Sequence, residues 1–462
     1  MFDARTYSAR RRRLRRDLGS GLALFLGNDE SPMNYAANGY PFRQDSSFLY
    51  FFGLDSPGLA GIVDVDEGTD ILFGDDIGLE DIIWMGFLPT LKERAAEVGV
   101  RATRPSTDAA DYLRQALARG RMVHLLPPYR AEHRLKMEEW LGVPPAEAKS
   151  RASQALVRAV VAQRSIKSEA EVAEIEAALT TTYKMYETAM RMAQPGVYER
   201  SIAGRIDGIA RAEGGATAFP TILSVNGQVL HNHGHANKLT KGRLLVVDSG
   251  AESASHYASD ITRTIPVGGK FTARQRDIYE IVHAANVGAI MAAKPGLPYK
   301  EVHLLAARII VDGLKSIGLM RGDSAEAVAR GAQALFFPHG LGHMMGLDVH
   351  DMENLGENNV GYDASIERSR QFGLAYLRMA RPLQPGHVMT VEPGIYFIPA
   401  LIDQWKAEGK ALDFVVYDKL DAYRGFGGVR IEDDILVTRD GGRILGRPIP
   451  KTAAQVEAAA TV

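Results

Sequence analysis

Two stretches of the chain share one pattern: GRLLVVDSG at residues 242–250 and GHVMTVEPG at residues 386–394. In both, a glycine precedes an apolar segment, an acidic residue stands six positions after that glycine, and a second glycine stands eight positions after it. A short apolar run bounded by glycines is typical of a buried β-strand. The pattern therefore predicts two equivalent strands that each carry an acid, Asp248 in one and Glu392 in the other.

The similarity extends on both sides of these strands and indicates an internal duplication. A long helical pattern ends in Ala-Gln-Pro-Gly at residues 193–196, and another, which starts near Thr272, ends in Ala-Lys-Pro-Gly at residues 293–296. A second acidic strand follows in each half and contains Asp260 or Glu432. We therefore expect one unit built from two related halves, with two acids in each half.

These acids have a chemical consequence. A carboxylate at the end of an apolar strand is costly to bury unless a positive charge pairs with it. In a duplicated unit the four carboxylates would converge about a pseudo-twofold axis, and their mutual repulsion would require a cation. The alternative is that they are independent surface acids, which is common for one strand end and unexpected for four in register. The four are Asp248, Asp260, Glu392 and Glu432.

A histidine-rich segment lies between the halves. Residues 336–351, FFPHGLGHMMGLDVHD, place His339, His343 and His350 within twelve residues in a glycine-rich, apolar setting. The chain contains no cysteine, so a metal must be bound by His, Asp and Glu. Four carboxylates and one imidazole suit a pair of Mn²⁺, Co²⁺ or Zn²⁺ ions better than one structural zinc. Paired metals can bind a bridging hydroxide and polarise a carbonyl group.

Composition excludes several other classes of protein. The 462 residues include 54 basic and 56 acidic side chains, a formal net charge of -2, which gives no general attraction to nucleic acid or anionic membranes. The lack of cysteine excludes a disulfide scaffold, an iron–sulfur cluster and a cysteine nucleophile. No apolar run approaches the roughly 20 residues needed to span a bilayer, so we expect a soluble protein.

The first 160 or so residues alternate short strands and helices. Strands are expected at residues 22–26 and 60–65, and helices at residues 108–119 and 131–141. The arginine-rich run at residues 10–16 is interpreted as a solvated helix, because the apolar segment after it is too short for an export signal. We expect a cytoplasmic protein with a domain boundary near residue 160. The N-terminal α/β domain would span residues 1–160 and the catalytic domain residues 161–462.

Together these motifs resemble the metallopeptidase family with the pita-bread fold, in the branch of aminopeptidase P and prolidase (Xaa-Pro dipeptidase). The motifs are SDITR at 259–263, HGLGH at 339–343, VEPG at 391–394 and RIED at 430–433, with YPFRQDS at 40–46 and YFFG at 50–53 in the N-terminal part. The resemblance covers nearly the whole chain. It implies an α+β fold, with a duplicated, pseudo-twofold antiparallel sheet covered by helices as catalytic domain and a smaller N-terminal α/β domain.

The resemblance implies two divalent metal ions per chain, with Mn²⁺ expected and Co²⁺ or Zn²⁺ as alternatives. The metal ligands would be Asp248, Asp260, His343, Glu392 and Glu432. Asp260 and Glu432 would bridge both ions, and Glu392 would also act as general base. A metal-bridging hydroxide would attack the scissile carbonyl, and the carboxylate would return the proton to the leaving proline nitrogen.

The resemblance also implies roles for other residues. His231 and His350 would bind substrate and stabilise the tetrahedral oxyanion, and His339 would be a further pocket histidine. Arg378, fourteen residues before Glu392, matches the arginine with which similar prolidases bind the substrate's free C-terminal carboxylate, which restricts them to dipeptides. Arg430 is interpreted as a partner that orients the metal ligands.

The sequence thus predicts a dinuclear-metal hydrolase that cleaves Xaa-Pro dipeptides. Aminopeptidase P activity on longer peptides remains an alternative, and so does a metal-free peptide-binding module of the same fold. The expected partners are a small Xaa-Pro peptide and a second copy in a homodimer, with no nucleic acid and no membrane.

Two departures from the family pattern bear on metal affinity, pH optimum and substrate preference. The segment at residues 219–231 is short and lacks a tyrosine that several relatives place near the metals, with Pro220 or a neighbour in its place. Asn232 follows His231 where a tyrosine is frequent. The loop from Asp248 to Asp260 is one residue longer than usual. Activity on organophosphates stays open.

Overall fold

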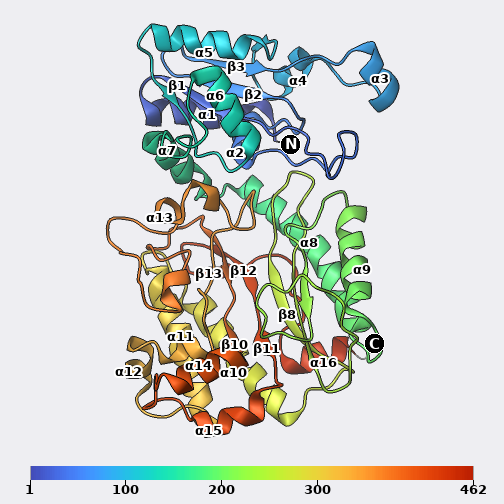
Figure 1. The fold of residues 1–462 in the computed structure, drawn as a ribbon, viewed down its shortest axis with the longest axis vertical. Coiled ribbons are helices and arrows are strands. Elements are labelled where there is room, and N and C mark those ends of the chain that lie inside the picture. Colours follow the sequence, from blue (N-terminus) through green and yellow to red (C-terminus); the bar gives the residue numbers. More distant parts are fainter. Residues whose placement is uncertain (1, 461–462) are drawn as a thin grey trace. The chain divides into compact units, whose positions relative to one another are not determined.

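The computed structural model describes residues 2–460, which form two compact units (Figure 1). Unit 1 comprises Met1–Arg164 and Glu353–Asn359, and unit 2 comprises Ser165–Met352 and Val360–Val462. Across residues 2–460, no helix combines the length and the apolar character needed to cross a bilayer. The mixture of sheets and helices confirms the α+β class predicted from the sequence.

Unit 1 contains a mixed five-stranded sheet with the order β4-β3-β2-β1-β5. Its strands are β1 (Leu22–Leu26), β2 (Ala60–Asp64), β3 (Thr69–Phe73), β4 (Ala102–Arg104) and β5 (Val123–His124). Its helices are α1 (Ala4–Leu18), α2 (Ser46–Phe52), α3 (Leu79–Met85), α4 (Leu91–Glu97), α5 (Asp108–Ala118), α6 (Ala131–Leu141) and α7 (Gln154–Arg164). The three central strands pair antiparallel, and β4 and β5 add to them in parallel. Leu24, Ile62 and Phe73 from the sheet pack with Leu113 and Met137 from the helices in one buried core.

Helix α1 contains the arginine-rich run, and the expectation that this helix is solvated is wrong for one face of it. Arg11 is fully buried, with 0% exposure. Its Nε donates to Asp70 Oδ2 at 2.8 Å, and its other nitrogens donate to the carbonyl oxygens of Phe51 and Val98 at 2.6 and 2.8 Å. A guanidinium group carries five donors in a planar fork, so it can join three segments where a lysine could not.

Unit 2 contains three small antiparallel sheets, ordered β6-β7-β8, β13-β12-β9 and β10-β11. Its strands are β6 (Ile222–Ser224), β7 (Leu244–Ser249), β8 (Ile261–Pro266), β9 (Val388–Val391), β10 (Gly394–Tyr396), β11 (Gly428–Arg430), β12 (Asp433–Val437) and β13 (Gly442–Ile444). Its longer helices are α8 (Glu169–Met192), α9 (Glu199–Ala212), α10 (Ala273–Ala292), α11 (Tyr299–Ser316) and α14 (Pro399–Ala407). Its shorter helices are α12 (Ser324–Ala329), α15 (Tyr417–Leu420), α16 (Ala453–Ala459), η1 (Ala332–Leu335), η3 (Leu374–Tyr376) and η4 (Asp421–Tyr423). Two further short helices, η2 (Glu353–Leu355) and α13 (Glu357–Val360), lie at the segment assigned to unit 1.

The internal duplication is confirmed at the level of helices and strands. Helices α8 and α10 each begin with a capping box, at Ser168 and Thr272, and each ends at the residue before the predicted Ala-Xaa-Pro-Gly turn. Gly196 and Gly296 at these turns have φ of 95° and 83°, a left-handed conformation that favours glycine. Helix α9 packs on α8 as α11 packs on α10, as Figure 1 shows.

The two halves meet at their acidic strands. Strand β7 pairs with β8 so that Asp248 lies opposite Thr262, and β9 pairs with β12 so that Val391 lies opposite Asp433. A β-bridge between Thr262 and Glu432 joins the two sheets. Only Asp248 of the four acids lies inside a strand, whereas Asp260 directly precedes β8. Glu392 follows β9 and Glu432 precedes β12, so these acids lie where the strands end.

The burial of Arg11 yields a stability prediction for unit 1. Arg11→Ala should lower the free energy of unfolding by about 3–5 kcal/mol, because Asp70 loses a buried partner and two carbonyl groups lose their donors. Arg12→Ala on the exposed face of the same helix is the matched control, and it should change stability by less than about 0.5 kcal/mol. Urea unfolding midpoints measure both, and equal midpoints for the two variants would contradict the role of Arg11.

Candidate metal centre

A cavity of about 650 Å³ lies within unit 2, at the meeting point of the acidic strands. Its volume falls in the range of small-ligand sites. Every site residue predicted from the sequence lines it. These residues are Asp248, Asp260, His343, Glu392, Glu432, His231, His339, His350, Arg378 and Arg430. The fold therefore brings together side chains as far apart in the chain as His231 and Glu432.

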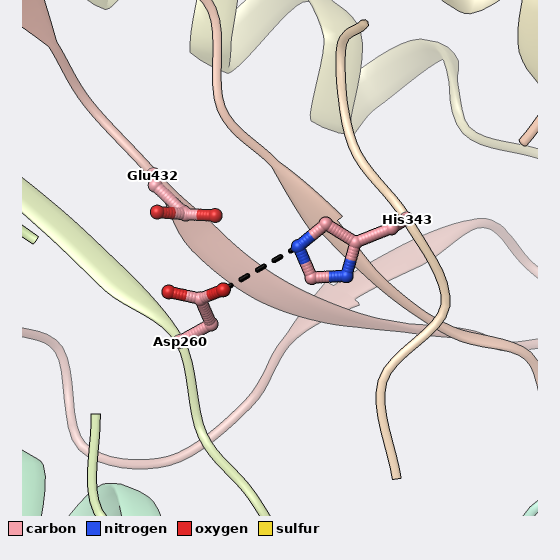
Figure 2. A group of neighbouring side chains, drawn as sticks. All are labelled: Asp260, His343 and Glu432. Carbon is pink, nitrogen blue, oxygen red and sulfur yellow. Dashed lines mark ion pairs between the residues drawn. The ribbon is translucent and has the colours of Figure 1, made fainter. Parts of the chain in front are cut away.

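Three of these residues form a compact group at the base of the site (Figure 2). One ligand atom from each of Asp260, His343 and Glu432 lies within 4.8 Å of the others, and all three side chains are buried. His343 Nε2 lies 3.4 Å from Asp260 Oδ2. Figure 2 shows the two carboxylates facing one another with the imidazole edge directed at them. Two carboxylates and one imidazole around a common point are a donor set for a divalent cation.

The local structure holds each of these side chains in place. The amide of Asp260 donates to Asp434 Oδ2 at 2.9 Å, and Thr262 Oγ1 donates to Glu432 Oε2 at 2.7 Å. His343 Nδ1 lies 3.0 Å from the carbonyl oxygen of Met344, an acceptor, so this nitrogen carries the proton. The tautomer leaves Nε2 with a free lone pair directed at the carboxylates, as metal ligation by histidine requires.

Asp248 and Glu392 line the same cavity but lie outside this compact group. Asp248 Oδ2 accepts a hydrogen bond from Arg430 Nη2 at 2.5 Å. Glu392 Oε1 lies 3.9 Å from His343 Nε2, and Glu392 Oε2 lies 3.8 Å from His339 Nδ1. The two acids thus flank the group, one on the side of Arg430 and the other on the side of the histidines.

The buried oxygen atoms and the pKa shifts indicate a site that fits cations. Among the described residues, Asp248 Oδ1 and Asp260 Oδ1 are buried without a hydrogen-bond partner, which is rare for a carboxylate oxygen. Burial, followed by the charges of neighbouring carboxylates, raises the pKa of Asp260 and of Glu432 well above the usual range. Burial raises the pKa of Glu392 to about 7. Bound cations would remove this repulsion and supply the missing partners.

Burial lowers the pKa of three histidines that line the cavity, His231, His339 and His343. Burial, followed by the charge of Arg430, lowers the pKa of His231 and lowers that of His339 to about 3. Burial, followed by the charge of His350, lowers the pKa of His343 well below its ordinary value. The His343 and His350 rings lie edge to face, with centroids 4.3 Å apart. Neutral imidazoles can donate one hydrogen bond each without repelling a cation.

Sequence reasoning missed Tyr396, which joins two of the predicted residues. Its hydroxyl accepts from Arg430 Nη1 at 2.8 Å and lies 2.9 Å from His339 Nε2. His339 Nδ1 faces the carbonyl oxygen of Gly340 at 2.8 Å, so the tyrosine hydroxyl donates to Nε2. A signal was present, because residues at even spacing along an extended segment share a face and Tyr396 lies four residues after Glu392.

Two aromatic residues and the short segment also contribute to the lining. Phe372 and Tyr376, neither of which was singled out from the sequence, also line the cavity. Pro220 lines it as well, at the place where relatives were expected to carry a tyrosine. Asn232 instead donates through Nδ2 to Ser224 Oγ at 3.1 Å. Neither Pro220 nor Asn232 therefore supplies a hydroxyl group to this wall.

The geometry of buried acids and neutral histidines in a duplicated fold is that of a metallopeptidase, and comparison with known proteins agrees. Residues 173–439 match metallopeptidase family M24, and residues 7–124 match the N-terminal domain of aminopeptidase P. The chain belongs to metallopeptidase family M24. The predicted family and the pita-bread fold are thus both confirmed.

Relatives include both activities of this branch. The chain is 31% identical to the human Xaa-Pro dipeptidase, over 95% of this chain and 88% of the relative. It is also 31% identical to a probable Xaa-Pro aminopeptidase of Aspergillus fumigatus, over 87% of this chain and 84% of the relative. The structure of aminopeptidase PepP from Pseudomonas aeruginosa superposes with a TM-score of 0.81 at 29% identity, covering 100% of this chain and 98% of that one.

The raised pKa of Glu392 yields a prediction for the metal-free protein. The folded state holds the Glu392 proton more tightly than the unfolded chain, so its contribution to stability falls as pH rises from 4.5 to about 7. Glu392→Gln cannot ionise, so the variant does not lose stability at this position as pH rises. Relative to the wild type, the metal-free variant should therefore gain up to about 3 kcal/mol between about pH 5 and about pH 8.

Urea unfolding after EDTA treatment measures this difference. Glu367→Gln, at an exposed glutamate of the same unit, serves as control and should leave the pH profile unchanged. Parallel profiles for wild type and Glu392→Gln would contradict the burial of an unpaired carboxylate at this position.

Proposed function

We propose that this metallopeptidase hydrolyses Xaa-Pro dipeptides. One observation carries the proposal: Arg378 lines the same cavity as Asp260, His343 and Glu432. A guanidinium group can bind a free carboxylate through two parallel hydrogen bonds. In an Xaa-Pro dipeptide that carboxylate lies one residue beyond the scissile carbonyl, so a cationic clamp within a single cavity selects short substrates.

The proposed metal ligands are Asp248, Asp260, His343, Glu392 and Glu432, which would bind two divalent ions. The support is the chemistry of the donor set, which contains carboxylate oxygen and imidazole nitrogen and no sulfur. Mn²⁺ is the proposed metal, because it prefers such hard ligands. When bound, the ions would lower the pKa of a coordinated water and polarise the substrate carbonyl.

Glu392 is the proposed general base. Its pKa of about 7 without metal indicates a carboxylate that can both accept and return a proton near neutral pH. The nitrogen of an Xaa-Pro bond is tertiary and carries no proton, so it must gain one before it leaves. A group that takes a proton from the attacking water and passes it to this nitrogen serves both steps.

His231 and His350 are the proposed donors to the oxygen of the tetrahedral intermediate. Both line the cavity, and burial keeps His231 neutral, so its ring offers an N–H donor where negative charge develops. His339 is proposed as a further histidine of the pocket, and its hydrogen bond with the Tyr396 hydroxyl would fix the orientation of its ring. Arg430 would orient Asp248 through their ion pair.

Aminopeptidase P activity is the second candidate. The observation that favours it is the match over the whole chain to the aminopeptidase of Pseudomonas aeruginosa. The two candidates share the metal centre and differ in what Arg378 binds.

Substrate length distinguishes them. Purified protein reconstituted with Mn²⁺, Co²⁺ or Zn²⁺ should cleave Ala-Pro with a higher kcat/KM than Ala-Pro-Pro-Ala. Arg378→Ala should raise KM for the dipeptide by about 10–100-fold, because a charge-assisted carboxylate contact is lost, and should change KM for the tetrapeptide much less. Arg370→Ala, at an exposed arginine nearby in sequence, is the control.

Equal or better cleavage of the tetrapeptide by the wild type would favour aminopeptidase P. Less than one metal ion per chain with no activity after reconstitution would favour the metal-free binding module.

We also propose a homodimer in which unit 1 supplies an apolar contact. Helix α3 has no buried residue, and its Ile83 and Trp84 are 70% and 80% exposed, followed by Phe87 at 78%. The helix projects from the sheet of its unit in Figure 1. Large apolar side chains gathered on one exposed segment are typical of a protein–protein contact.

We propose, in addition, that the chain divides into an N-terminal domain at residues 1–160 and a catalytic domain at residues 161–462.

Light scattering after size exclusion tests the contact. Trp84→Glu should convert a dimer to a monomer, because a charge would be buried in an apolar interface. Leu135→Glu, at another exposed apolar residue of unit 1, should leave the dimer intact. A monomeric wild type would contradict the proposal, and so would a Trp84→Glu variant that remains dimeric.

A further inference from the structure

A buried ion pair lies behind the histidine segment of the metal centre. Lys167 Nζ lies 2.7 Å from Asp351 Oδ2, and both side chains are 1% exposed. Lys167 belongs to the segment before α8, and Asp351 directly follows His350. The pair therefore links the start of unit 2 to the loop that carries two cavity histidines.

Asp351 closes this loop through its backbone as well as its side chain. Its amide donates to the carbonyl oxygen of Met344 at 2.9 Å, and its Oδ1 accepts from the amide of Asp348 at 3.4 Å. The amide of Gly346 donates to the carbonyl oxygen of Asp348 at 3.1 Å. The chain between His343 and His350 thus folds back on the Asp351 carboxylate.

Lys167 is anchored in turn to the strand that precedes Glu392. Its amide donates to the carbonyl oxygen of Gly386 at 2.8 Å, just before β9. The loop is attached to the same strand, because the amide of Met345 donates to the carbonyl oxygen of Val388 at 3.1 Å. The ammonium group therefore approaches the carboxylate from a fixed backbone.

Close packing leaves the pair little freedom. A Cβ atom added at Gly346 would lie 2.6 Å from Asp351 Oδ2 and 2.9 Å from Lys167 Cε. Any larger residue at this position would displace one of the two charged groups. The absence of a side chain at Gly346 is thus what allows the ion pair to lie beneath the loop.

Stability alone does not explain such a pair. Removing two charges from water is costly, and apolar residues of similar volume often give equal or greater stability than a buried ion pair. What the charges add is a defined direction and distance. Here the ion pair fixes the position of Asp351, the residue next to His350. The His350 ring lies edge to face against the His343 ring, with their centroids 4.3 Å apart.

We propose that Lys167 and Asp351 are positioning residues that hold the His350 imidazole at the substrate oxygen. The inference rests on the proposed function, in which His350 donates a hydrogen bond to the tetrahedral intermediate. A donor is effective there only when it is already oriented, and an error of about 1 Å can lower the rate about a hundredfold.

The double variant Lys167→Met/Asp351→Asn removes both charges and keeps the shape of the aspartate. Measured on Ala-Pro with the reconstituted enzyme, its kcat should fall by about 10–100-fold. KM should change by less than about threefold, because the proposed carboxylate clamp at Arg378 is untouched. The metal content per chain should equal that of the wild type, since His343 Nε2 is not altered.

The same double variant in a His350→Ala background decides whether the pair acts through His350. If it does, the charges have nothing left to position, and kcat should not fall further below that of His350→Ala. Equal fold-losses in both backgrounds would overturn the proposal, and so would a double variant with the kcat of the wild type. His350→Ala with full kcat would instead refute the role of His350 in the proposed function, and the inference with it.

Two further variants separate positioning from a loss of folding. Lys167→Arg keeps the positive charge, so this variant should fold. Its guanidinium group cannot occupy the same position as the lysine ammonium group, so its kcat should lie between those of the wild type and the double variant. Arg11→Met/Asp70→Asn removes the buried pair of unit 1 and should lower the melting temperature while leaving kcat unchanged. If the double variant of the loop fails to fold, a Lys167→Arg enzyme with the kcat of the wild type overturns the proposal.

Discussion

The repulsion among carboxylates in one buried cavity is the constraint on which the rest of this molecule depends. Asp260 and Glu432 would not share a space of a few ångströms as free anions, and burial raises the pKa of both. Cations remove the repulsion, and family M24 membership implies that divalent metals do so. Hydrogen bonds from the Asp260 amide to Asp434 and from Thr262 to Glu432 hold the acidic segments in place. Arg430 contributes as well, because it pairs with Asp248 and also contacts Thr262 and Tyr396.

Duplication explains how a single chain can place four acids around one point. Each half contributes one acid at the end of its first strand and one at the start of its second, and the Thr262–Glu432 bridge brings the halves together. The histidines of the cavity do not follow this twofold arrangement. His339, His343 and His350 come from one segment between the acidic strands of the two halves, whereas His231 comes from the first half, so the cavity combines a paired set of acids with an unequal set of imidazoles.

Much of the candidate site could be predicted from the sequence, and the residues that could not share a physical reason. Asp248 and Glu392 follow glycine-bounded apolar strands, a local pattern that is visible without a structure. The Lys167–Asp351 pair has no such local pattern, and Tyr396 has only its even spacing from Glu392, because the contacts that matter are with partners far away in the chain. The prediction that Arg11 is solvated was wrong for the same reason. A run of arginines ordinarily forms a solvated face, and only the packing of α1 places this guanidinium group in the core.

The sequence by itself determined the α+β class, the duplicated halves, the family and ten of the residues that line the cavity. These depend on short-range patterns, namely strand and helix periodicity, capping boxes and clustered motifs. Tertiary structure alone decided which of those residues lie within one ligand shell. It also decided which oxygen atoms lack a partner, which histidine tautomer is present and which charges are buried. Each of these depends on distances of a few ångströms between segments that are remote in sequence, and solvation and electrostatic energies change steeply over such distances.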